Sequence, residues 1–275
     1  MNKNKLTSLI HKVANRSNLP FNLVLTHFFL DVVLKRLACS EYSKNFVYKG
    51  GFLLSSIFGV QERTTIDLDL LLDKMKLDAE VIRQVLLEVF IDKKDGFRFE
   101  ICSITPIRDA DIYGGFRFDL LCRFENIRVN IPIDFATGDV ITPSPMEYQY
   151  HSVFDGQTIP IHAYNPETIL AEKLHTIFVR GVTNSRSKDY YDVYLIHKLH
   201  KGLNYDLLKT ACINTFRYRE TIFSVAKIRQ TVEAISTDPY SKSRWGSYRK
   251  RFAYARDLEF EVVIREIDLL LIKII

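Results

Sequence analysis

The chain has 275 residues, of which 47% are hydrophobic and 26% are charged, so a disordered or low-complexity protein is excluded. This length fits one large domain or two small ones. The formal net charge is +5 and lies in the rear half, because residues 160–275 hold 13 acidic and 19 basic residues, which indicates a polyanionic partner for that half.

The sequence predicts a cytoplasmic protein without a membrane span or a signal peptide. The longest apolar stretch, residues 267–275, is too short for a bilayer and is interrupted by Asp268 and Lys273. The N-terminal residues are polar and have no apolar core. The four cysteines are scattered without a CxxC or Cys/His cluster, which favours reduced thiols over disulfides or zinc.

Hydrophobic periodicity predicts an α+β fold in three parts. Two helices at 3–15 and 20–38 form an N-terminal helical segment, residues 1–45. Residues 46–160 form an α/β core, and residues 161–275 form a C-terminal helical domain. In the core we expect a small mixed sheet with flanking helices. The expected strands lie at 46–49, 64–73, 97–107, 116–124, 127–135 and 159–163, and the expected helices follow Gly51 and span 77–90.

The rear half carries continuous helix signals after a proline-containing loop, residues 142–151. Pro166 is placed to open the first helix and Gly181 to close it. The remaining helices are expected at 187–200, 205–215, 221–236, 242–258 and 260–274.

The most specific chemical feature is a pair of aspartates, Asp67 and Asp69, on a predicted strand. Residues two apart on a strand point to one face, so the two carboxylates converge and repel unless a cation lies between them. A hard divalent ion such as Mg²⁺ takes oxygen ligands of this kind. Asp134, on the polar side of another strand, is the candidate third ligand of a two-metal phosphoryl-transfer site. The alternative is that these acids only form the solvated face of an edge strand.

The segment before this pair is suited to bind an anion. Lys49, Gly50 and Gly51 end a strand and open a helix, where backbone N–H groups can face a phosphate and glycine permits close approach. Lys49 adds a positive charge. Paired glycines also occur as simple packing devices.

The run KGGFLLSSIFGVQERTTIDLDLLL resembles the first motif of the AbiEii/AbiGii-type nucleotidyltransferase toxins, which belong to the polymerase-β-like nucleotidyltransferase superfamily. The motif positions fall on Lys49, Gly50, Gly51, Gly59, Arg63, Thr65, Asp67 and Asp69. IPIDFATGDVITP is similar to the strand with the family's third acid, here Asp134. NPETILAEKLHTIFVRG and SRSKDYYDVYLI are similar to two later helices, whose motif residues fall on Lys173, Arg180, Lys188, Asp189 and Asp192. One departure is Phe52, where some relatives carry a phosphate-binding serine, so the chain relies on backbone or on Ser55 and Ser56.

The resemblance implies a nucleotidyltransferase that uses Mg²⁺ or Mn²⁺ and takes an NTP as substrate. It assigns catalytic roles to Asp67, Asp69, Asp134, Lys173 and Asp192, the three acids Asp67, Asp69 and Asp134 being the metal ligands. It assigns nucleotide binding to Lys49, Gly50, Gly51, Arg63, Arg180 and Asp189. It further implies a toxin of a toxin–antitoxin or abortive-infection system with a cognate antitoxin, and tRNA as a compatible acceptor.

The residues of the later helices have their own interpretation. Lys173 and Arg180 are seven apart on one helix face, where they could neutralise nucleotide phosphates or could be plain surface charges. Asp189 and Asp192 share a helix face, and could orient Lys173 or Arg180, act on the acceptor hydroxyl, or form salt bridges within the bundle. His175 is expected to be structural.

The segment 241–256 interleaves six basic residues with aromatic residues, a combination that can bind RNA through phosphates and stacking. The spacing of Trp245, Tyr248 and Phe252 also fits the buried face of a helix, so we expect the aromatics in the core and the bases as any RNA contact. Two further hypotheses are transfer to a small molecule or protein hydroxyl, and an inactive nucleotide-binding or regulatory module.

Overall fold

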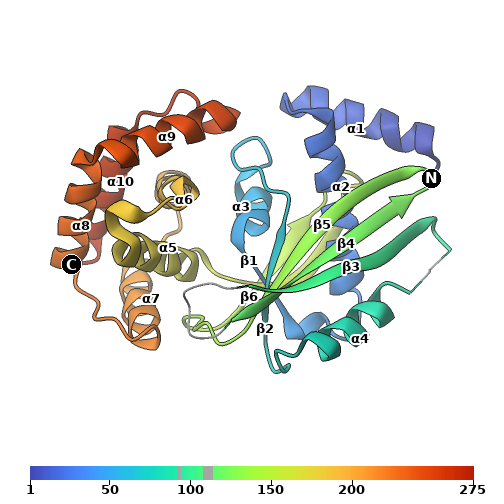
Figure 1. Ribbon diagram of the computed structural model, residues 1–275, viewed down its shortest axis with the longest axis horizontal. Helices are drawn as coiled ribbons and strands as arrows, with labels where there is room; N and C mark the ends of the chain where they lie inside the picture. The colour runs from blue at the N-terminus through green and yellow to red at the C-terminus, as the bar shows by residue number, and fades with distance from the viewer. Residues whose placement is uncertain (92–93, 108–113) are drawn as a thin grey trace. The chain divides into compact units, whose positions relative to one another are not determined.

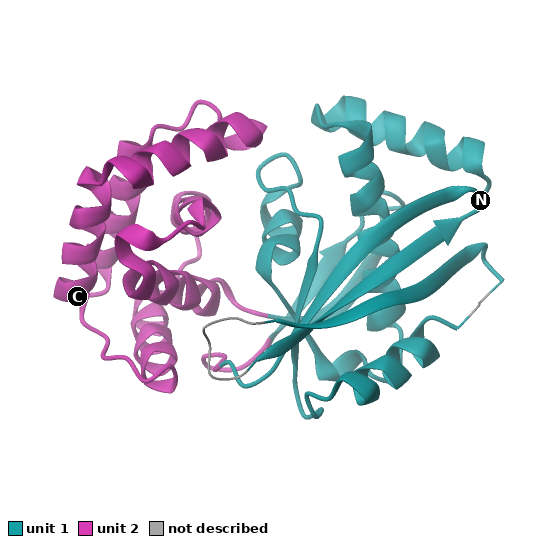
Figure 2. Ribbon diagram, in the orientation of Figure 1, with its two compact units in different colours: residues 1–139, 146–163 teal, residues 140–145, 164–275 magenta. Residues whose placement is uncertain are grey.

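The computed structural model describes residues 1–91, 94–107 and 114–275, and its ribbon is shown in Figure 1. The chain forms two compact units, which Figure 2 shows in different colours. Unit 1 comprises residues 1–139 and 146–163, and unit 2 comprises residues 140–145 and 164–275. The first two helices therefore belong to the same unit as the sheet.

Unit 1 is built on a mixed sheet of seven strands in the order β3-β4-β5-β2-β1-β7-β6. The β1·β7 and β2·β5 pairs are parallel and the other pairs are antiparallel. The α+β fold with a small mixed sheet is thus confirmed. The strands are β1 (Phe46–Lys49), β2 (Leu68–Leu72), β3 (Phe97–Ile107), β4 (Gly115–Phe124), β5 (Ile127–Ala136), β6 (Met146–His151) and β7 (Thr158–Ala163).

Helices α1 (Lys3–Ser17), α2 (Phe21–Ala38), α3 (Gly50–Phe58) and α4 (Ala79–Val89) complete unit 1. Strand β4 shows how the sheet sets its faces, because the buried residues Phe118, Leu120, Cys122 and Phe124 alternate with partly exposed ones. Phe28 of α2 lies against Phe97 of β3, and Phe97 stacks on Phe124. The apolar face of β3, β4 and β5 is therefore covered by α2, and the opposite face carries the polar side chains.

Unit 2 is a helical bundle, as its sequence predicts. Its helices are α5 (Pro166–Arg180), α6 (Ser187–Leu199), α7 (Tyr205–Tyr218), α8 (Val225–Thr237), α9 (Pro239–Arg251) and α10 (Phe260–Lys273). Helix α5 begins at Pro166, with the Asn165 side chain accepting a hydrogen bond from the Thr168 N–H, and Gly181 follows its last residue.

Two predicted elements are wrong. The loop expected at 142–151 contains strand β6, a short run of residues that follows two prolines. Tyr150 is the buried residue of this strand, and its hydroxyl donates a hydrogen bond to Asp31 of α2 at 2.7 Å. The helix expected at 242–258 runs instead from Pro239 to Arg251. Its end at Phe252 allows Tyr254 to fold back, so that its hydroxyl meets that of Tyr248 at 2.9 Å.

Within the described residues, no single helix has both the length and the apolar composition needed to cross a membrane. Helices α1 and α2 pass that test only as a pair, and they are bent by 114° at the break between them.

Candidate active site

The polar face of the sheet carries a row of four charged residues on four neighbouring strands. Arg117 of β4 pairs with Asp134 of β5, Asp134 pairs with Asp69 of β2, and Asp69 pairs with Lys49 of β1. Residues paired directly across strands point to the same face, so these four side chains lie next to one another. The row places two carboxylates between two cations.

Asp134 is held by Arg117 through a bidentate ion pair. The Nε and Nη2 atoms of Arg117 donate to the two carboxylate oxygens of Asp134, each at 2.7 Å. The hydrogen bonds from Arg117 to Asp134 raise the pKa of Arg117, partial burial opposes that effect, and the charges of Asp134 and Asp67 add to it. Arg117 therefore lies in the field of two of the predicted metal ligands.

Asp69 lies directly against the start of α3. A Cβ atom added at Gly50 would be 1.8 Å from Oδ2 of Asp69, and Gly50 has a φ of +69°. Because glycine has no Cβ, it permits both the left-handed backbone at this position and the close approach of the Asp69 carboxylate. Beside it, Lys49 donates from Nζ to Asp139 at 2.6 Å, and both of these side chains are largely buried. The predicted anion-binding turn and the predicted metal ligand are neighbours.

Gly50→Ala is expected to lower the stability of unit 1 by about 1–3 kcal/mol and to displace Asp69, because it adds both φ strain and a clash. Gly156→Ala is the matched control, since Gly156 has a φ of +73° and no atom within 4 Å of an added Cβ. Urea unfolding of the two variants separates the backbone cost from the clash. Equal losses in both would contradict the close packing of Asp69 on Gly50.

Asp67 precedes β2, which begins at Leu68, so only Asp69 of the pair lies within the strand. The Thr65 hydroxyl donates to Oδ1 of Asp67. The backbone N–H of Thr65 donates to Nε2 of His27 at 3.5 Å. Burial lowers the pKa of His27 to about 4, although this hydrogen bond opposes the shift, so His27 is a neutral acceptor at pH 7. A buried histidine thereby supports the loop that carries Asp67.

Arg63 is buried beneath the glycine turn. Its Nη1 atom donates to the Thr64 carbonyl at 2.5 Å, and its Nη2 atom would be 3.3 Å from a Cβ added at Gly51. The hydroxyl of Thr65 would be 2.9 Å from the same Cβ. Arg63, Thr65 and Asp69 therefore gather around the glycine turn, and Asp134 joins them from β5.

A second charged group lies in unit 2, where α5 packs on α6. Nζ of Lys173 is 2.7 Å from Oδ1 of Asp189 and 3.1 Å from Oδ2 of Asp192. The side chains of Asp189 and Asp192 are 1% and 0% exposed, and Nε of Arg186 is 3.3 Å from Asp189. Burial alone would lower the pKa of Lys173, but the two carboxylates outweigh it and raise the pKa. The sequence left several roles open for these two acids, and in the structure both form ion pairs with Lys173.

The other predicted residues of unit 2 lie elsewhere on its helices. Arg180 is the last residue of α5. His175 is buried, with its ring nitrogens 3.0 Å from the Thr221 hydroxyl and 3.4 Å from Nη1 of Arg219. Trp245 and Tyr248 are buried, as the helical spacing predicts. Of the bases near them, Arg249 pairs with Glu259 at 2.6 Å.

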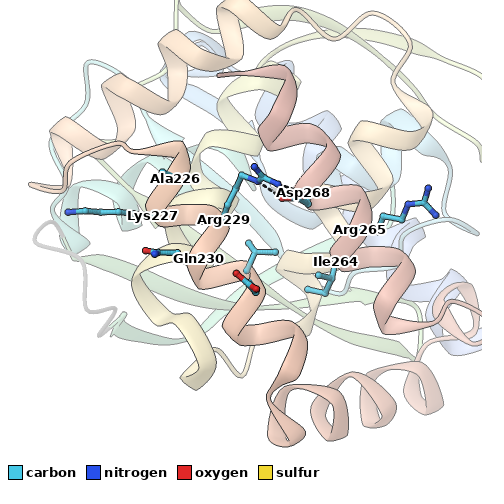
Figure 3. A pocket seen from close by; sticks show the side chains of 9 residues that line it. Ala226, Lys227, Arg229, Gln230, Ile264, Arg265 and Asp268 are labelled. Atoms are coloured by element: carbon cyan, nitrogen blue, oxygen red, sulfur yellow. Dashed lines mark hydrogen bonds and ion pairs between the residues drawn. The ribbon is translucent and has the colours of Figure 1, made fainter.

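A hollow of about 660 Å³ lies in unit 2 between α8 and α10 (Figure 3). Its charged lining residues carry both signs. Arg229 makes two hydrogen bonds to Asp268, at 2.6 and 3.1 Å, which Figure 3 draws as dashed lines. The mixed charges favour no ligand class, and none of the predicted site residues lines this hollow.

The donor set fits a hard cation, since Asp69 and Asp134 of the row and Asp67, two residues before Asp69, all supply carboxylate oxygens. Within residues 1–91, 94–107 and 114–275, no three His, Cys, Asp or Glu side chains are grouped so as to hold a metal ion. Both carboxylate oxygens of Asp134 accept from Arg117, so a cation that binds Asp134 has to displace this ion pair.

Sequence reasoning missed Arg117 and Asp139. Arg117 lies in the run FRFDLLCRF, where the alternation of apolar residues predicts its outward direction. Its partner depends on the β4·β5 register, which alternation alone does not define.

The comparisons with known proteins decide the family. Residues 32–266 match the family described as "Nucleotidyl transferase AbiEii toxin, Type IV TA system". The chain belongs to the AbiEii family. This AbiEii-family protein is thus a nucleotidyltransferase toxin of a type IV toxin–antitoxin system, as the resemblance of its motifs implies. Comparison with curated proteins gives no match.

Two solved structures from Helicobacter pylori are similar in fold to this AbiEii-family protein. One is described as a candidate nucleotidyltransferase, with a TM-score of 0.56 and 16% identity over 93% of this chain and 96% of that chain. The other is JHP933, with a TM-score of 0.52 and 16% identity over 92% of this chain and 91% of that chain. At this identity the likeness shows the fold, and it extends over both units.

Proposed function

We propose that this toxin transfers a nucleoside monophosphate from an NTP to a hydroxyl of tRNA, with Mg²⁺ or Mn²⁺ held by Asp67, Asp69 and Asp134. The observation that carries the proposal is the cross-strand row in which Asp134 and Asp69 lie beside each other and against the Lys49–Gly51 turn. Carboxylates next to a glycine turn at a helix start combine oxygen ligands for a cation with N–H groups for phosphates.

In the proposed reaction, the oxygen of the acceptor hydroxyl attacks the α-phosphorus of the NTP. The bond to the leaving pyrophosphate breaks, and the proton of the hydroxyl is released to solvent or to a nearby base. When bound, the divalent ion supplies charge neutralisation for the phosphate oxygens. The N–H groups of Gly50 and Gly51 orient the triphosphate, Arg63 supports that turn from below, and Thr65 orients the carboxylate of Asp67.

The proposal extends to the biology of the family. A type IV toxin–antitoxin family implies an antitoxin that accompanies the toxin. We expect this partner to be a protein encoded nearby, and we expect the pair to act in the cytoplasm, where tRNA is found, as an abortive-infection system. The nucleotide-binding roles of Arg180 and Asp189 and the catalytic roles of Lys173 and Asp192 stay predictions.

The test is incubation of the purified chain with Mg²⁺, each α-³²P-labelled NTP in turn, and total tRNA. Label on tRNA that is lost in the Asp67→Ala/Asp69→Ala variant is the expected result, and it also identifies the nucleotide. Label on a protein or small molecule instead would replace tRNA as acceptor. Absence of NTP binding in the wild-type chain would contradict the enzyme and favour an inactive regulatory module.

Arg117→Gln is expected to tighten binding of Mn²⁺ about fivefold. The guanidinium of Arg117 and a metal ion compete for the same oxygens of Asp134, and a bidentate pair is stronger than an ordinary surface ion pair. Titration calorimetry with Mn²⁺ measures the affinity without NTP or turnover.

Arg123→Gln is the control for this prediction, because Arg123 lies on the same strand and face but pairs with Glu100 at 3.0 Å. Weaker Mn²⁺ binding in Arg117→Gln would show that Arg117 positions Asp134 for the metal and does not compete with it.

A further inference from the structure

The polar face of β3, β4 and β5 carries a second row of charged residues, at the opposite end from the carboxylates. Arg98 of β3 pairs with Arg123 of β4, and Arg123 pairs with Arg128 of β5. Directly paired residues share a face, so three guanidinium groups stand side by side on this arginine row. Like charges placed directly opposite each other are unfavourable for a sheet, and the arrangement indicates an anionic ligand.

Two of the three arginines are exposed to solvent. Arg123 pairs with Glu100 at 3.0 Å. Arg98 and Arg128 are exposed, and among the residues that the structure describes neither has an acidic partner within salt-bridge distance. Asp119, the acidic residue on this face of β4, accepts a hydrogen bond from the Ser103 hydroxyl at 2.5 Å.

The arginine row and the carboxylates lie on the same face of the same strands. Alternate residues of β4 place Arg117, Asp119, Leu121 and Arg123 along this face, while the buried residues between them face α2. Along β5, Arg128 precedes Asp134 by six positions, which is about 20 Å of extended chain. A stacked polynucleotide strand advances about 3.4 Å per nucleotide, so about six nucleotides span this distance.

We propose that the polar face of β3, β4 and β5 is the RNA-binding surface of this toxin, with the arginine row binding phosphates of the acceptor strand upstream of the nucleotide that is modified. The inference rests on the proposed function, because that function places the acceptor hydroxyl at the carboxylates. A substrate with a hydroxyl at one end of the face and anionic groups about 20 Å away is a polynucleotide. Arginine binds phosphates through its planar fork, and an open sheet face accommodates a strand without a groove.

This surface differs from the one that charge counting predicts. The rear half has the larger basic excess, yet two bases of its segment 241–256 already pair with acids: Lys242 with Glu261 at 3.1 Å and Arg249 with Glu259 at 2.6 Å. Lys250, Arg251 and Arg256 of that segment are exposed. They provide a control in unit 2 with an equal change of net charge.

The test measures binding of fluorescently labelled total tRNA by anisotropy at several salt concentrations, without NTP. Arg98→Gln/Arg123→Gln/Arg128→Gln is expected to weaken binding about tenfold or more, and to reduce the slope of log affinity against log salt by roughly two to three. The Arg→Lys triple variant keeps the charge and retains most of the binding. Lys250→Gln/Arg251→Gln/Arg256→Gln is expected to weaken binding less than about threefold.

Two results would overturn the inference: wild-type affinity in the arginine-row variant, or an equal or greater loss in the unit 2 variant. Equal affinity of the wild-type chain for labelled poly-glutamate would also overturn it, by showing a general anion surface. The single variants Arg98→Gln and Arg128→Gln replace the triple variant if it unfolds, since neither residue has an acidic partner among the residues that the structure describes. Because binding is read without NTP, absence of transfer would count against the proposed function alone.

Discussion

Asp69→Asn is expected to reduce nucleotide transfer by about a hundredfold to a thousandfold while leaving the fold intact. Asp69 is the central carboxylate of the row, between Asp134 and Lys49, and it lies against Gly50. Replacing it by the isosteric amide keeps the packing on Gly50 but removes the charge that a divalent ion needs. A single-turnover transfer of labelled NTP to tRNA measures the loss, and thermal unfolding checks the fold.

Asp119→Asn is the control for this variant. Asp119 lies on the same face of the sheet, but its cross-strand neighbour is Pro132, and its carboxylate accepts a hydrogen bond from the Ser103 hydroxyl. The Asp119→Asn variant should transfer the nucleotide at nearly the wild-type rate. An equal loss in both variants, or activity above a tenth of wild type in Asp69→Asn, would contradict a specific role for the row.

Lys173→Met is expected to destabilise unit 2 by about 3–5 kcal/mol, because it removes the cation that contacts the buried carboxylates of both Asp189 and Asp192. The single tryptophan of the chain, Trp245, is buried in unit 2. Its fluorescence during urea unfolding therefore reports this unit, and separates its transition from that of unit 1.

The pH dependence of this effect has a defined sign. The pKa of Lys173 is raised above 10.5 in the folded protein, so its stabilising contribution is complete below pH 10.5 and is lost as pH rises through the raised value. The difference between wild type and Lys173→Met should therefore stay constant from pH 7 to 9.

Lys198→Met is the matched control, since Lys198 is exposed on the same helix as the two acids. Its free energy of unfolding should differ from that of the wild type by less than about 0.5 kcal/mol. If Lys173→Met unfolds at the wild-type midpoint, the ion pairs of Lys173 do not contribute to stability, and conversion to Met is tolerated as a simple apolar replacement.

The fold could be predicted from sequence wherever one periodicity dominated. The alternation in β4 and β5 and the Pro166 and Gly181 boundaries of α5 predict those elements closely. Strand β6 was missed because two prolines precede a short run in which only Tyr150 is buried. The end of α9 at Phe252 was missed because the interaction that favours it, Tyr248 with Tyr254, is tertiary.

The candidate site could be predicted in part for the same reason. Spacing alone predicts that Asp67 and Asp69 are close to each other, whereas the approach of Asp69 to the glycine turn depends on the pairing of β1 with β2. Asp134 was predicted from its place on the polar side of a strand and from the family resemblance. Arg117 and the arginine row depend on which strands pair and in which register. That information is non-local, and a single sequence carries it only weakly.

The most direct measurement of the central claim is a crystal structure of the chain with Mn²⁺ and a non-hydrolysable NTP analogue, with the manganese located by its anomalous signal. We predict an anomalous peak at the carboxylates of Asp67 and Asp69, the triphosphate at the Gly50–Gly51 turn, and Arg117 turned away from Asp134. Manganese and nucleotide bound away from these residues, with the Arg117–Asp134 ion pair unchanged, would contradict the account.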